Sequence, residues 1–144
     1  MNGFFPKIES FETVKDMAKQ GMYSGLILTA MLGLGLAVLY FTDGTPVLGK
    51  AVYGQEKIYS MAGVGTEIAI VLLLTWRVSK GKAMVSGVLL TLIAVIEFIS
   101  RVLAGPSIVS FVLFFWVFRG LINAMRASFV YDRLKLADQA EEVF

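Results

Sequence analysis

The chain has 144 residues, of which 57% are hydrophobic and 17% are charged, and its formal net charge at pH 7 is +2. A soluble domain carries about a quarter charged residues, so this composition, with a mean hydropathy of +0.75, indicates an integral membrane protein. The small net charge argues against a nucleic-acid partner. The sequence contains no Cys and no His, which excludes disulfides, thiolate metal sites and imidazole ligands for zinc or haem.

Apolar residues recur at helical spacing in the N-terminal segment 1–21, at Ile8, Phe11, Val14 and Ala18, with charged residues between them. This pattern predicts an amphipathic helix that lies on the inner membrane surface. Because its acidic and basic charges are mixed, docking of this helix on a partner protein is an equally good interpretation.

Four apolar segments follow, each near the ~20 residues that an α-helix needs to cross a bilayer. They occupy residues 22–41, 59–78, 83–103 and 107–126. The expected fold is therefore all-α: an integral membrane four-transmembrane-helix bundle whose membrane domain covers residues 22–126.

The segments between and after these spans are short. Gly and Pro residues in Thr42–Lys57 predict turns or a short hairpin. The tight turn Ala104–Ser107 predicts that the third and fourth helices pack antiparallel. The tail 127–144 keeps the helical period of apolar residues, so we expect it to extend the fourth helix into the cytoplasm.

Lys and Arg residues predict the orientation, because they are in excess on the cytoplasmic side of membrane proteins. The cationic residues assigned to that side are Lys7, Lys15, Lys19, Arg77, Lys80, Lys82, Arg133 and Lys135. The loop assigned to the opposite side carries Lys50 and Lys57. We therefore expect a multi-pass protein of the cell inner (plasma) membrane, with both termini inside.

Small residues recur every four positions in the first span, at Gly21, Gly25, Thr29, Gly33 and Ala37. Residues i and i+4 share a helix face, so this spacing predicts a nearly side-chain-free stripe along the helix. Such a stripe lets two backbones approach closely, which favours helix association in lipid. The favoured partner is another span of the same chain, and another subunit is the alternative.

Several polar residues fall inside the spans, namely Glu67, Glu97, Arg101, Arg119 and Asn123. At about 1.5 Å per residue, Glu67 and Glu97 reach a similar depth, and Arg119 is long enough to extend toward them. A charge at mid-bilayer costs about 2.5–3.5 kcal/mol, so these groups are expected to meet as a nearly balanced intramembrane cluster. Glu97 and Arg101 have the i, i+4 spacing of a helical ion pair.

This cluster has three interpretations, of which structural pinning of the helices is favoured over a proton or ion relay and over catalysis. A Ser–His or Cys–His nucleophile is excluded, and every Lys lies outside the spans. No cofactor or metal is expected. The aromatic run Phe111–Phe118 is interpreted as lipid-facing surface.

The expected function is that of a non-enzymatic accessory or structural subunit of a larger membrane protein complex. Its partners would be the lipid bilayer and other membrane subunits or copies of itself. The alternative is a homo-oligomeric ion- or proton-coupled transporter or channel in which Glu67 and Glu97 bind the cation or proton. A weaker third hypothesis is an enzyme that modifies a lipid or quinone.

Overall fold

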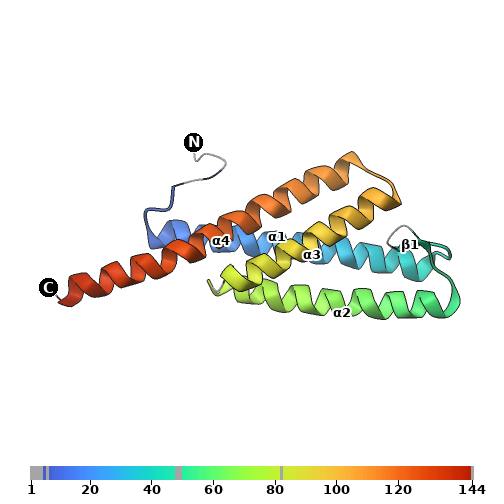
Figure 1. Ribbon diagram of the computed structural model, residues 1–144, viewed down its shortest axis with the longest axis horizontal. Helices are drawn as coiled ribbons and strands as arrows, with labels where there is room; N and C mark the ends of the chain where they lie inside the picture. The colour runs from blue at the N-terminus through green and yellow to red at the C-terminus, as the bar shows by residue number, and fades with distance from the viewer. Residues whose placement is uncertain (1–4, 6, 48–49, 82, 144) are drawn as a thin grey trace.

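The structure, a computed structural model, describes residues 5, 7–47, 50–81 and 83–143, with the backbone alone for 141–143 (Figure 1). The helices are α1 (Phe11–Phe41), α2 (Gly54–Ser79), α3 (Ala83–Ala104) and α4 (Ile108–Val143), and a hairpin of β1 (Pro46–Val47) and β2 (Lys50–Ala51) joins α1 to α2. All four helices are long and apolar enough to cross a membrane. The predicted set of four long apolar helices is confirmed, and it indicates a multi-pass membrane protein.

Successive helices run in opposite directions (Figure 1). The start of α1 and the α2–α3 turn therefore lie at one end, here called the basic end, and the hairpin and the α3–α4 turn lie at the other, the hairpin end. Gly81 and Gly105 make the two helix–helix turns with φ values of +79° and +138°, which residues with a Cβ rarely adopt. Helix α1 packs against α2, α3 and α4, and most extensively against α4.

Helix α1 begins at Phe11, because the Ser10 side chain caps it by accepting a hydrogen bond of 3.3 Å from the backbone N–H of Thr13. It then continues without interruption to Phe41. No break occurs near residue 21, where the amphipathic segment meets the first span. No Pro lies in this stretch, so nothing in the backbone ends the helix there.

The apolar face of the first part of α1 is covered by the last part of α4. Val14 and Met17 are buried together with Ala127, and Leu134 packs against them. This face is therefore occupied by the chain itself, while the position of the segment relative to a membrane surface stays a prediction. Residues 1–4 and 6 of this segment lie outside the described residues.

Helix α4 continues past the other three helices as far as Val143, and its free end projects from the basic end (Figure 1). The tail is thus helical and continuous with the fourth span, and residue 144 lies outside the described residues. Its cytoplasmic location remains a prediction.

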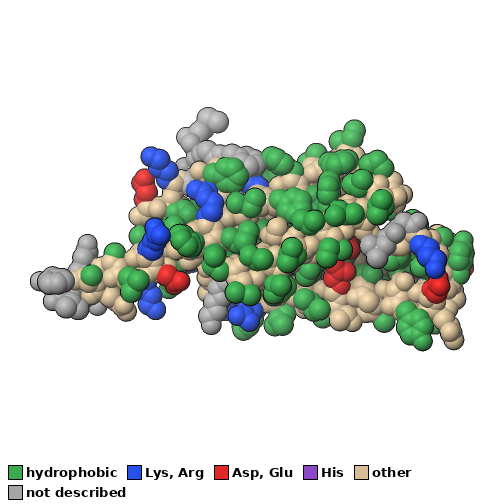
Figure 2. Space-filling view, in the orientation of Figure 1, with side chains coloured by type: hydrophobic (Ala, Val, Ile, Leu, Met, Phe, Trp, Pro, Cys, Tyr) green, Lys and Arg blue, Asp and Glu red, His purple; other side chains and the backbone are tan. Residues whose placement is uncertain are grey.

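The core consists of apolar side chains from all four helices. Its fully buried members include Leu28, Val71, Val78, Leu90, Ala94, Val117 and Leu121. The outer surface is also apolar: hydrophobic side chains cover the middle of the molecule, and charged ones gather toward the two ends (Figure 2). A surface of this kind suits contact with lipid better than contact with water.

The interpretation of the aromatic run Phe111–Phe118 as lipid-facing surface is only half right. Phe114 is 1% exposed, and Phe98 of α3 packs edge-to-face against it at 5.2 Å between ring centroids. Phe115, by contrast, is exposed. The helical period turns every third or fourth residue of the run toward α3, so a continuous aromatic sequence does not make a continuous lipid-facing surface.

Two members of the predicted small-residue stripe make close contacts with neighbouring helices. A Cβ on Gly21 would overlap Ala124 of α4, and a Cβ on Gly25 would overlap Thr75 of α2. Thr75 fits there because its hydroxyl donates a 2.6 Å hydrogen bond within its own helix. This half of the stripe packs against spans of the same chain.

The other half of the stripe does not pack against spans of the same chain. Gly33 has no described atom within 4 Å of where a Cβ would lie, and Ala37 is exposed. A four-residue step turns about 40° past one full helical turn, so the stripe rotates by roughly 160° between Gly21 and Ala37. The stripe therefore winds from the core to the outer surface, and only its first half packs against other spans of the chain.

Exchanging each of two glycines of α1 for valine tests this division. Gly25→Val should destabilise the isolated chain by about 1–3 kcal/mol, because the side chain has to displace Thr75. Gly33→Val makes the same change of helix propensity in open space and should have an effect below about 0.5 kcal/mol. Unfolding in mixed micelles, followed by circular dichroism, measures both; equal losses of stability would contradict the packing described.

Candidate functional site: an apolar cavity with an ion pair at the hairpin end

The Glu97 and Arg101 side chains form the predicted ion pair. Arg101 Nε lies 3.8 Å from Glu97 Oε2, and both side chains are mostly buried, at 31% and 18% exposure. Arg101 also reaches across to α1, where Nη2 donates a 2.9 Å hydrogen bond to the carbonyl oxygen of Met31. This guanidinium therefore connects α3 to α1 as well as to its own helix.

Glu67 joins this pair from α2. It is half-buried and close enough to Glu97 for the two carboxylates to interact electrostatically. Within the described part of the chain, Glu67 makes no hydrogen bond or ion pair of its own. The structure thus brings Glu67, Glu97 and Arg101 into one group.

Arg119 and Asn123 lie elsewhere. The Arg119 guanidinium stacks 5.1 Å from the centre of the Trp116 ring, beside Gln20 and Tyr23 near the other half of α1. Asn123 is fully buried and donates a 3.0 Å hydrogen bond from Nδ2 to Gln20 Oε1. The predicted single cluster is therefore two separate groups, one at each half of the bundle.

Arg119 was expected beside the carboxylates because its depth along the membrane normal is compatible with theirs. Depth alone does not give direction around the helix. On α4, the side that carries Phe111, Phe114 and Phe118 faces Phe98 of α3, whereas Arg119 projects on the α1 side. The group around Glu97 consequently contains two carboxylates and one guanidinium, and the predicted charge balance is not reached among these residues.

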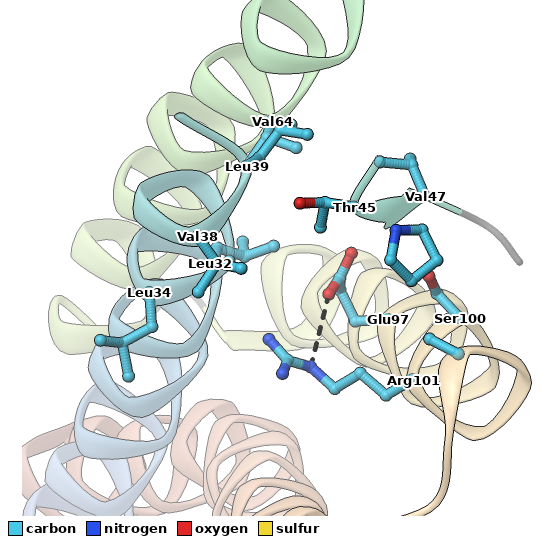
Figure 3. Close-up of a pocket in the computed structure, with 13 residues that line it drawn as sticks. Leu32, Leu34, Val38, Leu39, Thr45, Val47, Val64, Glu97, Ser100 and Arg101 are labelled. Carbon is cyan, nitrogen blue, oxygen red and sulfur yellow. Dashed lines mark ion pairs between the residues drawn. The ribbon is translucent and has the colours of Figure 1, made fainter. Parts of the chain in front are cut away.

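A cavity of about 400 Å³ lies next to this group at the hairpin end (Figure 3). Its lining residues come from all three neighbouring helices and the hairpin: Leu32, Leu34, Gly35, Val38, Leu39, Thr45, Pro46, Val47, Val64, Glu97, Ser100, Arg101 and Ala104. The Glu97 carboxylate points into the cavity, between Arg101 and the Thr45 side chain (Figure 3). The cavity thus has largely apolar walls and one carboxylate–guanidinium pair.

The hairpin that closes this end is held by a lysine. Lys57 Nζ donates hydrogen bonds of 2.9 Å to Asp43 Oδ1 and 3.2 Å to the carbonyl oxygen of Tyr40. Val52, which follows β2, is buried and bonds through its N–H to the carbonyl oxygen of Thr45 at 3.3 Å. These contacts fix the hairpin over the cavity.

Three of the residues that build these groups were missed at the level of sequence. Gln20 is a polar residue on the buried side of α1, which is a usable signal once helix faces are assigned. Lys57 could be expected to pair with an acidic residue in its own loop. The carbonyl of Met31 carries no sequence signal, because any residue supplies the same acceptor.

Comparison with protein-family models, with curated proteins and with solved structures gives no match to this chain. The site is therefore interpreted from its own geometry. Among the described residues, no group of three or more Asp and Glu side chains gathers as metal ligands. The groups available for chemistry at this site are one guanidinium and two carboxylates beside an apolar cavity.

Replacing Arg101 by methionine tests its bridging role. Arg101→Met keeps most of the apolar length but removes the hydrogen bond to Met31 and leaves Glu97 without its cation, so we expect a loss of about 1–2 kcal/mol in unfolding free energy. The double variant Arg101→Met/Glu97→Gln should recover part of that loss. Unfolding in mixed micelles measures both. Additive losses would show that the two side chains do not interact.

Proposed function

We propose that this protein is a non-enzymatic accessory subunit of a larger membrane protein complex. The observation that carries the proposal is the difference between the two halves of the bundle. Toward the basic end, the glycines within the helices, Gly21, Gly25, Gly87 and Gly120, lie against neighbouring helices of the same chain. At the hairpin end, Gly33, Gly35, Gly63 and Gly65 have no described atom within 4 Å of where a Cβ would lie.

The surface at the hairpin end has the composition of a helix contact. Ala62, Thr66 and Ala69 of α2 share one face and are exposed, and the Thr66 hydroxyl is satisfied by a 2.9 Å hydrogen bond to the carbonyl oxygen of Ala62. Small residues at such positions allow a second helix to approach closely, and this is a main source of affinity between helices in lipid. A helix of another subunit is the partner that fits this face.

The polar groups support a structural role. Arg101 connects α3 to α1, and Asn123 connects α4 to α1, so both side chains link helices of the chain. The side chain of Ser128 adds a 3.2 Å hydrogen bond from α4 to the carbonyl oxygen of Gly81 in the α2–α3 turn. Groups engaged in this way are poorly suited to exchange protons with a substrate.

A specific observation favours a second candidate, the homo-oligomeric proton- or ion-coupled transporter. Because Arg119 lies away from Glu67 and Glu97, the two carboxylates repel each other with Arg101 as the neighbouring cation. Two acids that repel each other bind a proton or another cation more readily than a balanced pair does. In this candidate, the small-residue face of α2 would contact another copy of the chain.

We further propose that the basic end faces the cytoplasm of a cell whose inner membrane contains the protein. Lys15, Lys19, Arg77 and Lys80 lie at this end, and Lys19 pairs with Asp16. Lys50 and Lys57 lie at the hairpin end and pair with Glu56 and Asp43. Lys82, which the same reasoning counts, lies outside the described residues. The excess of cations marks the cytoplasmic side, so both termini are inside.

Single cysteines test this orientation, because the chain contains none of its own. Gln55→Cys places a thiol at the exposed hairpin end, and Ser79→Cys places one at the basic end. In intact cells a membrane-impermeant maleimide should label the first and not the second. Both should be labelled after permeabilisation, and the reverse pattern in intact cells would overturn the assignment.

The subunit proposal is tested by extraction in a mild detergent, followed by native mass determination. Wild-type chain should be recovered with at least one unrelated membrane chain at fixed stoichiometry. Thr66→Trp should reduce that recovery at least tenfold, because the indole blocks close approach to α2. Val85→Trp is the matched control, since Val85 is isosteric with threonine and 70% exposed on α3.

The stability of each purified variant shows whether lost recovery reflects lost docking. Both tryptophan variants should unfold within about 0.5 kcal/mol of wild type. Recovery of the wild-type chain as a homo-oligomer alone would contradict the subunit proposal. If that oligomer also conducted protons in liposomes and Glu67→Gln abolished the flux, the transporter would be the better description.

A further inference from the structure

The cavity at the hairpin end combines apolar walls with a carboxylate–guanidinium pair, and a simple packing defect would need no such pair. We propose that it is a binding site for an amphiphilic organic cation, a primary ammonium group carrying a short alkyl chain. The Glu97 carboxylate would accept the ammonium, and the apolar wall would bury the chain. This inference concerns a small molecule and does not rest on the proposed partner subunit.

The sign of the charge follows from what each ionic group already does. Arg101 Nη2 donates a hydrogen bond to the carbonyl oxygen of Met31, and Nε of the same guanidinium lies 3.8 Å from Glu97 Oε2. Glu97 points into the cavity, and Glu67 adds a second negative charge from α2. An incoming ligand therefore meets an excess of negative charge, which favours a cation over an anion.

The geometry of the ion pair also leaves the Glu97 carboxylate able to accept a further hydrogen bond. Its separation from Arg101 Nε is 3.8 Å, longer than the about 2.7–2.9 Å of a charge-assisted hydrogen bond. Nε is itself buried without a hydrogen-bond partner among the described residues. Because neither group has its best geometry here, the carboxylate can bond to an ammonium without giving up a strong contact.

The walls select the rest of the ligand. The cavity wall includes the aliphatic side chains of Leu34, Val38, Leu39 and Val64. A hydrated inorganic ion would leave these side chains without an apolar contact. An alkyl chain of moderate length matches them. Leu34 and Val38 are also 69% and 52% exposed, which means that the wall continues onto the outer surface of α1. An amphiphile dissolved in the bilayer can therefore reach Glu97 laterally.

The test uses the full chain in phosphatidylcholine nanodiscs and octylammonium as the probe. Isothermal titration, corrected for partitioning into empty nanodiscs, should show one saturable site per chain. Octanol, which has the same chain without the charge, should bind at least tenfold more weakly, and octyl sulfate should show no saturable binding. Equal binding of octanol and octylammonium, or no saturable site for octylammonium, would overturn the proposal.

Two variants place the site within the molecule. Glu97→Gln should weaken octylammonium binding at least tenfold, and Val38→Phe should do the same by filling the cavity while every charge is kept. Val85→Phe makes the same change on the exposed face of α3 and should leave binding unaltered. If Glu97→Gln does not fold, the comparison of Val38→Phe with Val85→Phe still decides; wild-type affinity in Val38→Phe would overturn the assignment.

Discussion

Close contact between α1 and its two main neighbours, α2 and α4, is the interaction on which the rest of the structure depends. Gly25 admits the Thr75 side chain, and a Cβ on Gly120 would overlap the Ser24 hydroxyl, so backbones meet side chains directly at the basic half of the bundle. In lipid the helices have no hydrophobic drive to associate, and such contacts supply the dispersion energy that holds them together. Where the glycines of α1 turn outward, these close contacts end, and larger side chains such as Leu32 and Leu39 are buried in their place. The cavity at the hairpin end lies in the half of the bundle where this close contact is absent.

The polar residues behave differently in the two halves because of this change in packing. In the closed half, Asn123 and Gln20 satisfy each other between α4 and α1, and a buried amide pair of this kind mainly fixes helix register. In the open half, Arg101 reaches Met31 across the bundle, but Glu97 keeps a carboxylate that faces free volume. Polar side chains thus form a closed link between helices toward the basic end and an accessible site at the hairpin end. Loose packing is the condition for that accessibility.

Hydropathy and local spacing were sufficient to predict four apolar helices and the Glu97–Arg101 pair. Both depend on interactions within one segment: a bilayer sets the length of a span, and i, i+4 spacing sets the distance between two side chains of one helix. The prediction that failed depended on the rotation of each helix about its own axis relative to its neighbours. Arg119 was assigned to the carboxylate cluster from its depth, but it lies on a different side of its helix from the one assumed. Hydropathy carries little of this information, since many large apolar side chains of every helix are exposed on the outer surface.

The open half of the bundle is also why both proposals concern the same end of the molecule. A helix docked against Ala62 and Thr66 would cover the outward face of α2, whereas the cavity lies between α1, α3 and the hairpin, with Val64 as its lining residue from α2. These are different faces of one helix, since residues 62 and 64 lie about 200° apart around its axis. A partner helix and an amphiphilic cation can therefore be accommodated together.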